Sequence, residues 1–420
     1  MRACVVGSGG REHALATALG RTVDVVVTPG NPGIPGTTEQ GHRISCSEKG
    51  PDETDADLVV IGPEAPLVDG LADRLRAQGR VVFGPGADGA RLEGSKSFMK
   101  EVLSEAGVPT ARYGVFTRAE EALEFLKSLP GLFVVKTDGL ASGKGVLVTD
   151  SIGEAERDVV SKLSGEAFGE AGRRVVIEEG LVGLECSVHV LCDGKKVVAL
   201  APARDYKRVS DGDQGPNTGG MGSISPVVDV DSQSLGVIID SCVEPLVAAL
   251  RRRGIDYRGV LYAGLMLTSD GPKVLEYNVR FGDPETQVIA GRTQGDFAQL
   301  LHDAASGNLG DAPAISDAAS VCVVLAAKGY PAGVQTGDPI SGTEDALAIP
   351  GVSLAFAGAG VGVGNAGELV TSGGRVLGVI GTGDTVAQAR ELAYAGAGCI
   401  KWEGMHYRLD IGADTSDPGL

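Results

Sequence analysis

Short apolar segments alternate with helical patterns at the start of the chain, and this alternation restricts the possible folds more than any other feature. The predicted strands are Ala3–Val6, Asp24–Val27, Leu58–Ile61 and Val81–Phe83. Helical patterns cover Arg11–Leu19 and Leu67–Gln78 between them. Parallel strands need crossover connections, usually helices, and their burial on both faces makes them almost wholly apolar. We therefore predict an α/β N-terminal domain built on a parallel sheet.

The pattern then changes from crossovers to hairpins. A helix is predicted from Ser95, an N-cap residue, to Glu105, and a boundary at Gly107-Val108-Pro109. The strands Leu132–Lys136 and Gly145–Thr149 flank only a glycine-rich turn, which indicates a hairpin. The further predicted elements are strands at Arg174–Glu178, Glu185–Leu191, Lys196–Ala201, Gly259–Leu267 and Lys273–Asn278 and a long helix at Ser234–Arg252.

A small β-rich domain is predicted after a linker at Ala312–Asp317. Its predicted elements are strands at Ser320–Ala326, Leu354–Ala357 and Val376–Gly381 and a helix at Val386–Tyr394. A chain of 420 residues has room for two or three domains of roughly 150 residues each. We predict boundaries of 1–106, 107–314 and 315–420, with a lid subdomain at about 120–190 in the central unit.

The charge and cysteine content indicate a soluble cytoplasmic protein. A net charge of −18 would repel nucleic acids and anionic membranes. The N-terminus resembles no signal peptide, and we expect no apolar run long enough to span a bilayer. The seven cysteines sit in apolar or mixed segments without zinc-site spacing, which predicts reduced core residues. We expect a monomer without nucleic-acid or membrane partners.

The segment Gly7–His13 follows the first predicted strand and opens the first helix. Backbone amides and the helix dipole favour an anion at such a position. A dinucleotide would need glycine or alanine in place of Glu12, whose carboxylate opposes a pyrophosphate. We therefore expect Gly9 and Gly10 to bind a small substrate that carries a phosphate. A tight turn without a ligand is the alternative.

The segment Gly139–Gly145 looks like a P-loop but departs from it in spacing, and a strand follows it instead of a helix. Gly145 also stands where a P-loop has the serine or threonine that binds magnesium. What remains is a glycine-rich hairpin loop that carries Lys144, with Lys136 at the end of the preceding strand. We expect this loop to close over a triphosphate and exclude water, with a solvated hairpin as the alternative.

Acidic residues near strand ends suggest further ligand contacts. Alternation puts Glu276 and Asn278 on one face of a strand, where hard oxygen ligands suit magnesium. Arg280–Glu285 then crowds a cation and two carboxylates around a turn, which could also be a purely structural salt bridge. Glu178–Leu181 ends another strand, where free backbone groups could bind an adenine edge or simply be solvated. Gly215–Gly222 is a glycine-rich loop beside Lys207-Arg208.

These segments together resemble the phosphoribosylamine–glycine ligases, also called glycinamide ribonucleotide synthetases. The matching blocks are Gly7–His13, Pro29-Gly30-Asn31, Gly62–Leu67, Leu92–Lys96, Lys136–Val146, Gly215–Gly222, Tyr262–Met266, Asn278–Thr286 and Gly329-Tyr330-Pro331. Their order and number span nearly the whole chain. The resemblance implies an ATP-grasp fold that holds the nucleotide between two α+β lobes.

The resemblance also implies roles for individual residues. It implies ATP contacts at Lys96, Lys136, Gly143, Lys144, Glu178, Glu179, Leu181 and Glu185. Substrate contacts are expected at Gly9, Gly10, Asn217, Gly219, Asp283 and Glu285. Lys144 and Arg280 are expected to act in catalysis, and Glu276 with Asn278 to bind Mg²⁺ or Mn²⁺. The sequence departs from the family pattern at Leu184, Tyr206 and Ala357, where a glutamate and two histidines are usual.

The activity implied by the resemblance joins glycine to 5-phosphoribosylamine through a glycyl phosphate formed from ATP. Positioning and charge neutralisation would supply most of the catalysis, so no nucleophilic side chain is required. Another ATP-grasp carboxylate–amine ligase or a carboxylase is one alternative. A nucleotide-binding regulator without turnover is the other, but it would not need Lys144, Glu276 and Asn278 around the transferable phosphate.

Overall fold

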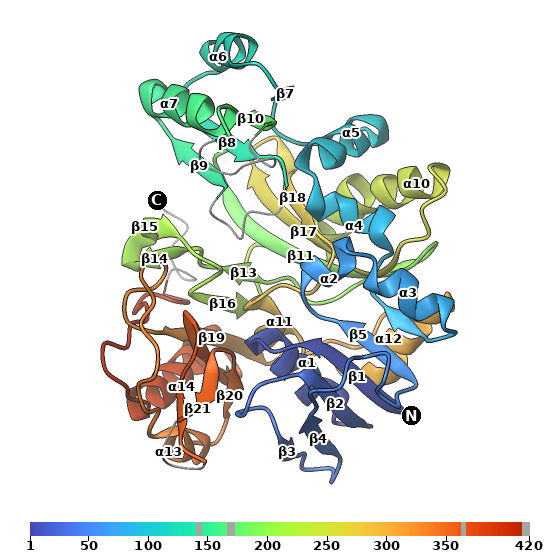
Figure 1. The fold of residues 1–420 in the computed structure, drawn as a ribbon, viewed down its shortest axis with the longest axis vertical. Helices are drawn as coiled ribbons and strands as arrows, with labels where there is room; N and C mark the ends of the chain where they lie inside the picture. The colour runs from blue at the N-terminus through green and yellow to red at the C-terminus, as the bar shows by residue number, and fades with distance from the viewer. Residues whose placement is uncertain (140–144, 166–172, 363–366, 414–420) are drawn as a thin grey trace.

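The computed structural model describes residues 1–139, 145–165, 173–362 and 367–413 (Figure 1). Its first sheet has the strand order β3-β4-β2-β1-β5-β6. The strands are β1 (Arg2–Gly7), β2 (Asp24–Pro29), β3 (Gly36–Thr37), β4 (Arg43–Cys46), β5 (Leu58–Ile61) and β6 (Val82–Phe83). All neighbours pair in parallel except β3 with β4, so the predicted parallel sheet is confirmed. The short strands β3, at the edge, and β4, beside it, were not predicted.

The helices of this region begin with α1 (Gly10–Leu19). The predicted helix at Leu67–Gln78 is wrong in one respect, because it is split into α2 (Glu64–Val68) and α3 (Leu71–Ala77). Gly70 separates the two with a left-handed backbone at φ 75°, a conformation that glycine adopts without strain. Two more helices, α4 (Ala87–Gly94) and α5 (Lys96–Ala106), lead out of the region, and Ser95 caps α5 as predicted.

Two antiparallel four-stranded sheets form the middle of the chain, with the orders β7-β10-β8-β9 and β12-β11-β17-β18. The first comprises β7 (Tyr113–Phe116), β8 (Phe133–Thr137), β9 (Val146–Thr149) and β10 (Val175–Glu179), covered by α6 (Ala119–Lys127) and α7 (Ile152–Leu163). The second comprises β11 (Leu184–Asp193), β12 (Val197–Ala199), β17 (Arg258–Thr268) and β18 (Gly271–Asn278). The predicted hairpin is β8–β9.

One helical stretch corrects an expectation from the sequence. Within the described residues, Ser232–Arg252 is long and apolar enough to cross a membrane by length and composition, with a mean hydropathy of 1.4. It consists of α9 (Ser232–Ile238), a π-helical turn (Ile239–Val243) and α10 (Glu244–Arg252). Part of this stretch is buried, and Ile238, Leu246 and Leu250 pack in the same core as the β11–β17 sheet. An apolar face that packs in a protein core accounts for this composition.

The last sheet draws strands from two distant parts of the chain. Its order is β13-β16-β19-β23-β20, where β13 (Arg204–Asp205) and β16 (Gly222–Ser225) precede β19 (Ala319–Ala326), β20 (Val352–Phe356) and β23 (Arg375–Gly383). The remaining elements are β14 (Arg208–Ser210), β15 (Gln214–Asn217), α11 (Glu285–Ile289), α12 (Phe297–Ser306), α13 (Thr343–Leu347), β21 (Ala359–Val361), β22 (Leu369–Thr371) and α14 (Val386–Cys399). The last helix extends beyond its predicted end at Tyr394, because small residues such as Gly396 continue its close packing on Val352 and Val379.

Candidate active site

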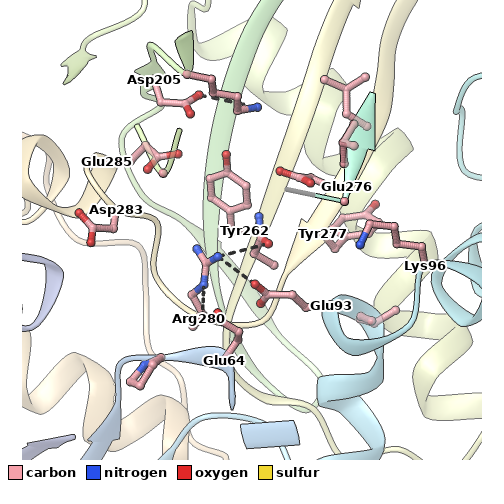
Figure 2. Close-up of a pocket in the computed structure, with 18 of the residues that line it drawn as sticks. Glu64, Glu93, Lys96, Asp205, Tyr262, Glu276, Tyr277, Arg280, Asp283 and Glu285 are labelled. Carbon is pink, nitrogen blue, oxygen red and sulfur yellow. Dashed lines mark hydrogen bonds and ion pairs between the residues drawn. The ribbon is translucent and has the colours of Figure 1, made fainter. Parts of the chain in front are cut away.

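A cavity of about 470 Å³ is lined by residues from all three parts of the chain (Figure 2). Half of the lining residues are charged. The ionisable lining residues include Arg11, Glu64, Glu93, Lys96, Lys136, Asp205, Lys207, Tyr262, Glu276, Arg280, Asp283, Glu285 and Arg375. A cavity with this many opposite charges suits a large polar ligand that carries both phosphates and a cationic group.

The structure brings together about half of the predicted site residues. The cavity is lined by Lys96, Lys136, Gly219, Glu276, Asn278, Arg280, Asp283 and Glu285. The candidates among the described residues that do not line it are Gly9, Gly10, Glu178, Glu179, Leu181, Glu185 and Asn217. Gly143 and Lys144 lie outside the described residues.

Lys96 and Lys136 reach the cavity from different elements. Lys96, at the start of α5, donates from Nζ to the carbonyl of Gly139 at 3.0 Å, at the entry to the glycine-rich loop. Lys136 Nζ lies 3.1 Å from the carbonyl of Leu275 on β18. Burial lowers the pKa of Lys96, and the nearby Glu276 carboxylate opposes that shift. The two ammonium groups thus form a cationic end of the cavity.

Glu276 and Asn278 both line the cavity from β18, as their spacing predicts. Burial acts to raise the pKa of Glu276, but Lys207, Lys136 and Lys96 outweigh it, so the net shift is downward. Glu276 is therefore a carboxylate at neutral pH. Tyr277, between them, also contributes to the lining, and its hydroxyl donates to the carbonyl of Cys242.

Arg280 is held by a pair of carboxylates from the N-terminal region. It donates from Nη2 to Glu93 Oε1 at 2.8 Å and from Nε to Glu64 Oε2 at 3.3 Å. Burial raises the pKa of Glu93, and Arg280 opposes that shift. Glu93 Oε2 also accepts the amide of Val279 at 2.9 Å. This network joins helices α2 and α4 to the segment that follows β18 (Figure 2).

Glu178 does not lie at a solvated strand end. It is 2% exposed, and its carboxylate lies 2.7 Å from Lys136 Nζ and 2.9 Å from Lys100 Nζ. Burial acts to raise the pKa of Glu178, but the two lysines lower it overall. Its neighbour Glu179 accepts the backbone amide of Arg112 at 2.9 Å. Both carboxylates are thus engaged by the protein in this structure.

A second acidic corner lies on the other side of the cavity. Asp205 is almost buried, and burial together with Glu285 and Glu185 raises its pKa against the opposing charge of Lys207. Lys207 Nζ bonds Glu185 at 3.0 Å and lies farther, 4.0 Å, from Asp205. Glu285, on α11, accepts the hydroxyl of Ser187 at 3.2 Å. Negative charge exceeds positive charge in this corner, which favours a cationic group.

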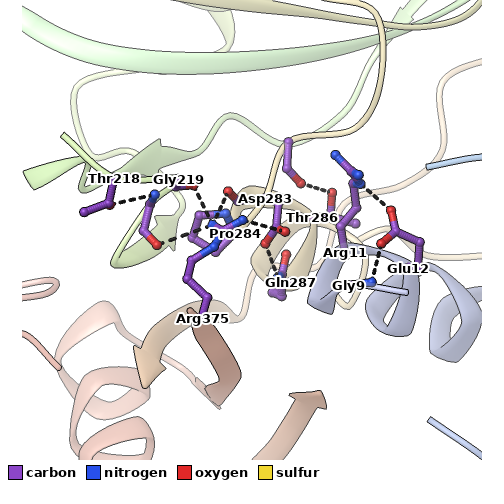
Figure 3. Close-up of polar contacts among 12 residues, drawn as sticks. Gly9, Arg11, Glu12, Thr218, Gly219, Asp283, Pro284, Thr286, Gln287 and Arg375 are labelled. Carbon is purple, nitrogen blue, oxygen red and sulfur yellow. Dashed lines mark hydrogen bonds and ion pairs between the residues drawn. The ribbon is translucent and has the colours of Figure 1, made fainter. Parts of the chain in front are cut away.

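Arg375 enters the cavity from β23 and joins the glycine-rich loop Gly215–Gly222 to the turn Arg280–Glu285 (Figure 3). It donates from Nη2 to Asp283 Oδ2 at 2.9 Å and from Nη1 to the carbonyl of Gly219 at 2.5 Å. Gln287 donates to the other Asp283 oxygen at 2.8 Å. Asp283 is therefore paired with a cation and an amide, whereas Glu285 accepts the Ser187 hydroxyl and forms no ion pair within the described residues.

The N-terminal loop corrects a detail of the sequence-based expectation. Glu12 Oε2 accepts the amide of Gly9 at 2.6 Å, and Glu12 Oε1 accepts from Arg11 Nε at 2.6 Å (Figure 3). The amide of Gly9 therefore already binds an anion, which is supplied by the same loop. Arg11, one residue before Glu12, lines the cavity instead of the glycines.

The donor set allows a magnesium ion but does not enclose one. Within the described ranges no group of three or more His, Cys, Asp and Glu side chains is placed to hold a metal. The Glu276 carboxylate and the Asn278 amide oxygen offer two hard ligands on one face. Two protein ligands are enough for magnesium when phosphates and waters complete its coordination shell. The residues therefore fit that ion.

Several lining residues escaped sequence reasoning. Glu64 and Glu93 lie in two of the quoted sequence blocks, so those blocks contained a signal for them. Lys207 was noted only as positive charge beside the Gly215–Gly222 loop. Asp205 and Arg375 gave no such signal, because they reach the cavity only after β13 and β23 join one sheet.

Comparison with known proteins decides the family. The N domain of phosphoribosylglycinamide synthetase matches residues 1–93, its ATP-grasp (A) domain matches 94–286 and its C domain matches 320–414. The chain belongs to this family. A phosphoribosylglycinamide synthetase relative in Rhizobium meliloti, named phosphoribosylamine–glycine ligase, is 44% identical over 98% of both chains. Another of that name in Caldanaerobacter subterraneus is 41% identical over 98% of this chain and all of its own.

Solved structures agree with this family assignment. The crystal structure of phosphoribosylamine–glycine ligase from Thermotoga maritima is 38% identical, with a TM-score of 0.86 over 98% of this chain and 100% of its own. A biotin carboxylase domain from Hydrogenobacter thermophilus has a TM-score of 0.71 at 16% identity, covering 99% and 94%. At that identity the likeness shows the ATP-grasp fold alone, and the predicted fold class is confirmed.

Proposed function

We propose that this synthetase family member is an ATP-dependent ligase that joins glycine to 5-phosphoribosylamine and yields glycinamide ribonucleotide, ADP and phosphate in purine synthesis. The observation that carries the proposal is the cavity itself. It sets Lys96 and Lys136 beside Glu276 and Asn278, with an acidic corner opposite. These groups match the phosphates, the metal ion and the ammonium group that the reaction must hold together.

We assign ATP to the end of the cavity with the lysines. Lys96 and Lys136 neutralise its phosphates, and Glu276 with Asn278 hold Mg²⁺, which supplies charge neutralisation when bound. A titration of activity with Mg²⁺ and Mn²⁺ distinguishes which of the two ions the site uses. Glu179 ends β10, Leu181 follows it and Glu185 lies near the start of β11, and we assign the adenosine to their backbone and side chains. Lys144 and Gly143 belong to the same assignment by their place in the sequence.

We assign glycine to the acidic corner. Its ammonium group would lie against Glu285 and Asp205, because Asp283 is already paired with Arg375. This placement sets the glycine carboxylate toward the γ-phosphate for attack, and Arg280 stabilises the charge that develops there. The acyl phosphate must then meet the amine before water does, so exclusion of water is part of the mechanism.

We assign phosphoribosylamine to the side of the cavity nearest the N-terminal loop. Arg11 lines the cavity there, and the helix N-terminus at Gly9 and Gly10 lies behind it. Gly219 lines the cavity on the loop that Arg375 bonds, and Asn217 lies two residues before it on the same loop. The proposed units remain 1–106, 107–314 and 315–420, and a cytoplasmic monomer without nucleic-acid or membrane partners remains our expectation.

Glycine-dependent release of ADP in the presence of freshly made 5-phosphoribosylamine tests the activity. We expect release only when ATP, glycine and phosphoribosylamine are all present. Release with bicarbonate or another carboxylate in place of glycine would support the alternative of a different ATP-grasp ligase or carboxylase. Nucleotide binding without any turnover would support a regulatory protein.

A further inference from the structure

Lys100 is a buried cation that the proposed reaction does not use directly. It follows Lys96 by four residues on α5, the spacing that places two side chains on one face of a helix. Lys96 lines the cavity, whereas Lys100 is 0% exposed and lies behind it. A buried ammonium group is costly unless it is paired and hydrogen-bonded. Its partners therefore indicate what it does.

The partners of Lys100 tie three segments together. Its Nζ donates to Glu178 Oε2 at 2.9 Å and to Thr110 Oγ1 at 2.7 Å, and lies 5.2 Å from the centre of the Tyr113 ring. Thr110 in turn donates to the carbonyl of Val274 at 2.6 Å. Val274 lies on β18, two residues before Glu276. Lys100 is thus anchored to the strand that carries the proposed metal ligands.

Glu178 lies between two cations. One carboxylate oxygen bonds Lys100 and the other lies 2.7 Å from Lys136 Nζ, which lines the cavity. One negative charge is therefore shared between two positive charges, and the three groups together carry a charge of +1. Without Lys100, Glu178 and Lys136 would form a neutral ion pair. Such a pair attracts a phosphate less strongly, because the electrostatic attraction depends on the net charge that the ligand meets.

We propose that Lys100 is a positioning residue that shares Glu178 and so keeps the charge of Lys136 available to the nucleotide phosphates. This inference rests on the proposed assignment of ATP to Lys96 and Lys136. It predicts that Lys100 affects nucleotide affinity through Glu178 without touching the nucleotide. A lysine that only stabilised the fold would have no such dependence on Glu178.

The test compares Lys100→Met with Lys100→Met/Glu178→Gln in the full chain. Calorimetric titration with a non-hydrolysable ATP analogue and Mg²⁺ gives the dissociation constant, and steady-state kinetics gives the three apparent KM values. We expect Lys100→Met to weaken analogue binding by about tenfold, the scale expected from altering a buried charge pair. The KM values for glycine and phosphoribosylamine should stay within about twofold of wild type, because their proposed sites are remote from Lys100.

The second substitution distinguishes an electrostatic role of Lys100 from a purely structural one. Glu178→Gln removes the carboxylate that would neutralise Lys136, so the double variant should bind the analogue more tightly than Lys100→Met alone. Lys127→Met, which removes an exposed lysine on α6, is the matched control and should bind like wild type. If Lys100→Met does not fold, Lys100→Arg keeps the charge and should retain analogue affinity within about threefold.

Wild-type affinity in folded Lys100→Met would overturn the proposal. So would a double variant that binds no better than Lys100→Met, equal rises in all three KM values, or a folded Lys100→Arg that has lost analogue binding. Failure of the wild-type chain to bind the ATP analogue would instead refute the proposed function. The two failures are therefore distinguishable.

Discussion

Glu12 Oε2 accepts the amide of Gly9 at 2.6 Å, so the N-terminus of α1 is capped by its own carboxylate. The same carboxylate accepts from Arg11 Nε, which fixes that guanidinium beside the cavity. A loop of this composition commonly offers its amides to an external anion. Here Glu12 occupies one of those amides and leaves Arg11 as the cation that a phosphate would meet.

Replacing Gly10 with valine tests the phosphoribosylamine side of the cavity. A Cβ atom at Gly10 would come within 2.9 Å of Gln287 Nε2, which bonds Asp283. We expect the apparent KM for phosphoribosylamine to rise about tenfold, with those for ATP and glycine near wild type. Gly36→Val is the matched control, because nothing lies within 4 Å of that position. Loss of ATP affinity in Gly10→Val would assign the loop to the nucleotide.

Arg280→Met should destabilise the fold and abolish turnover. It leaves Glu93 and Glu64 without their common cation, and breaking a buried ion pair on one side costs about 3 kcal/mol. Adding Glu93→Gln should recover part of that free energy of unfolding but not the activity. Urea denaturation measures the first effect and ADP release the second. An exposed pair, removed by Arg118→Met, should change stability by less than about 1 kcal/mol. Active Arg280→Met would exclude a catalytic role.

Glu276→Gln should lower the affinity for magnesium while the protein stays folded. The substitution keeps the shape of the side chain but removes the charge that a hard cation prefers. We expect activity to fall at least about tenfold at limiting Mg²⁺ and to recover partly at high Mg²⁺. Activity measured across a magnesium titration checks this, with the exposed Glu121→Gln as control. An unchanged magnesium dependence would remove Glu276 from the metal site.

His189 should make the fold less stable as pH falls. Its ring is 0% exposed, and Nε2 accepts the amide of Gly282 at 3.0 Å. Burial, with a smaller effect of Arg280, lowers the pKa of His189 to about 3 from 6.5. Between these two pKa values the unfolded chain binds a proton at His189, whereas the ring stays neutral in the folded protein. The free energy of unfolding should fall by up to about 1.4 kcal/mol per pH unit as pH decreases from 6.5 toward 3.

Urea midpoints at pH 7, 6 and 5 in wild type and His189→Gln measure this contribution. Glutamine keeps an acceptor for the Gly282 amide but does not titrate in this range, so the variant should lose stability less steeply with acid. Equal slopes in the two proteins would show that His189 is protonated in the fold.

The strands of the first sheet and the β8–β9 hairpin were predictable from sequence, because each depends on the local spacing of apolar residues and turn-forming glycines. That Glu276 and Asn278 of β18 both line the cavity followed from strand alternation in the same way. The break at Gly70 and the membrane-like composition of Ser232–Arg252 were misjudged, because hydrophobic pattern alone does not reveal a left-handed residue or the face that a helix buries.

The sequence by itself determined the family, the order of the elements and the lysine and carboxylate candidates, since these depend on local pattern and on motifs in a fixed order. Only the tertiary structure decided which charges meet. Lys100 pairs with Glu178 across 78 positions, and Arg375 with Asp283 across 92. No local pattern encodes such pairs, because they form only when elements distant in the chain pack together, and a buried charge is stable there only with a partner. That pairing satisfied Asp283, whereas Glu285 forms no ion pair among the described residues.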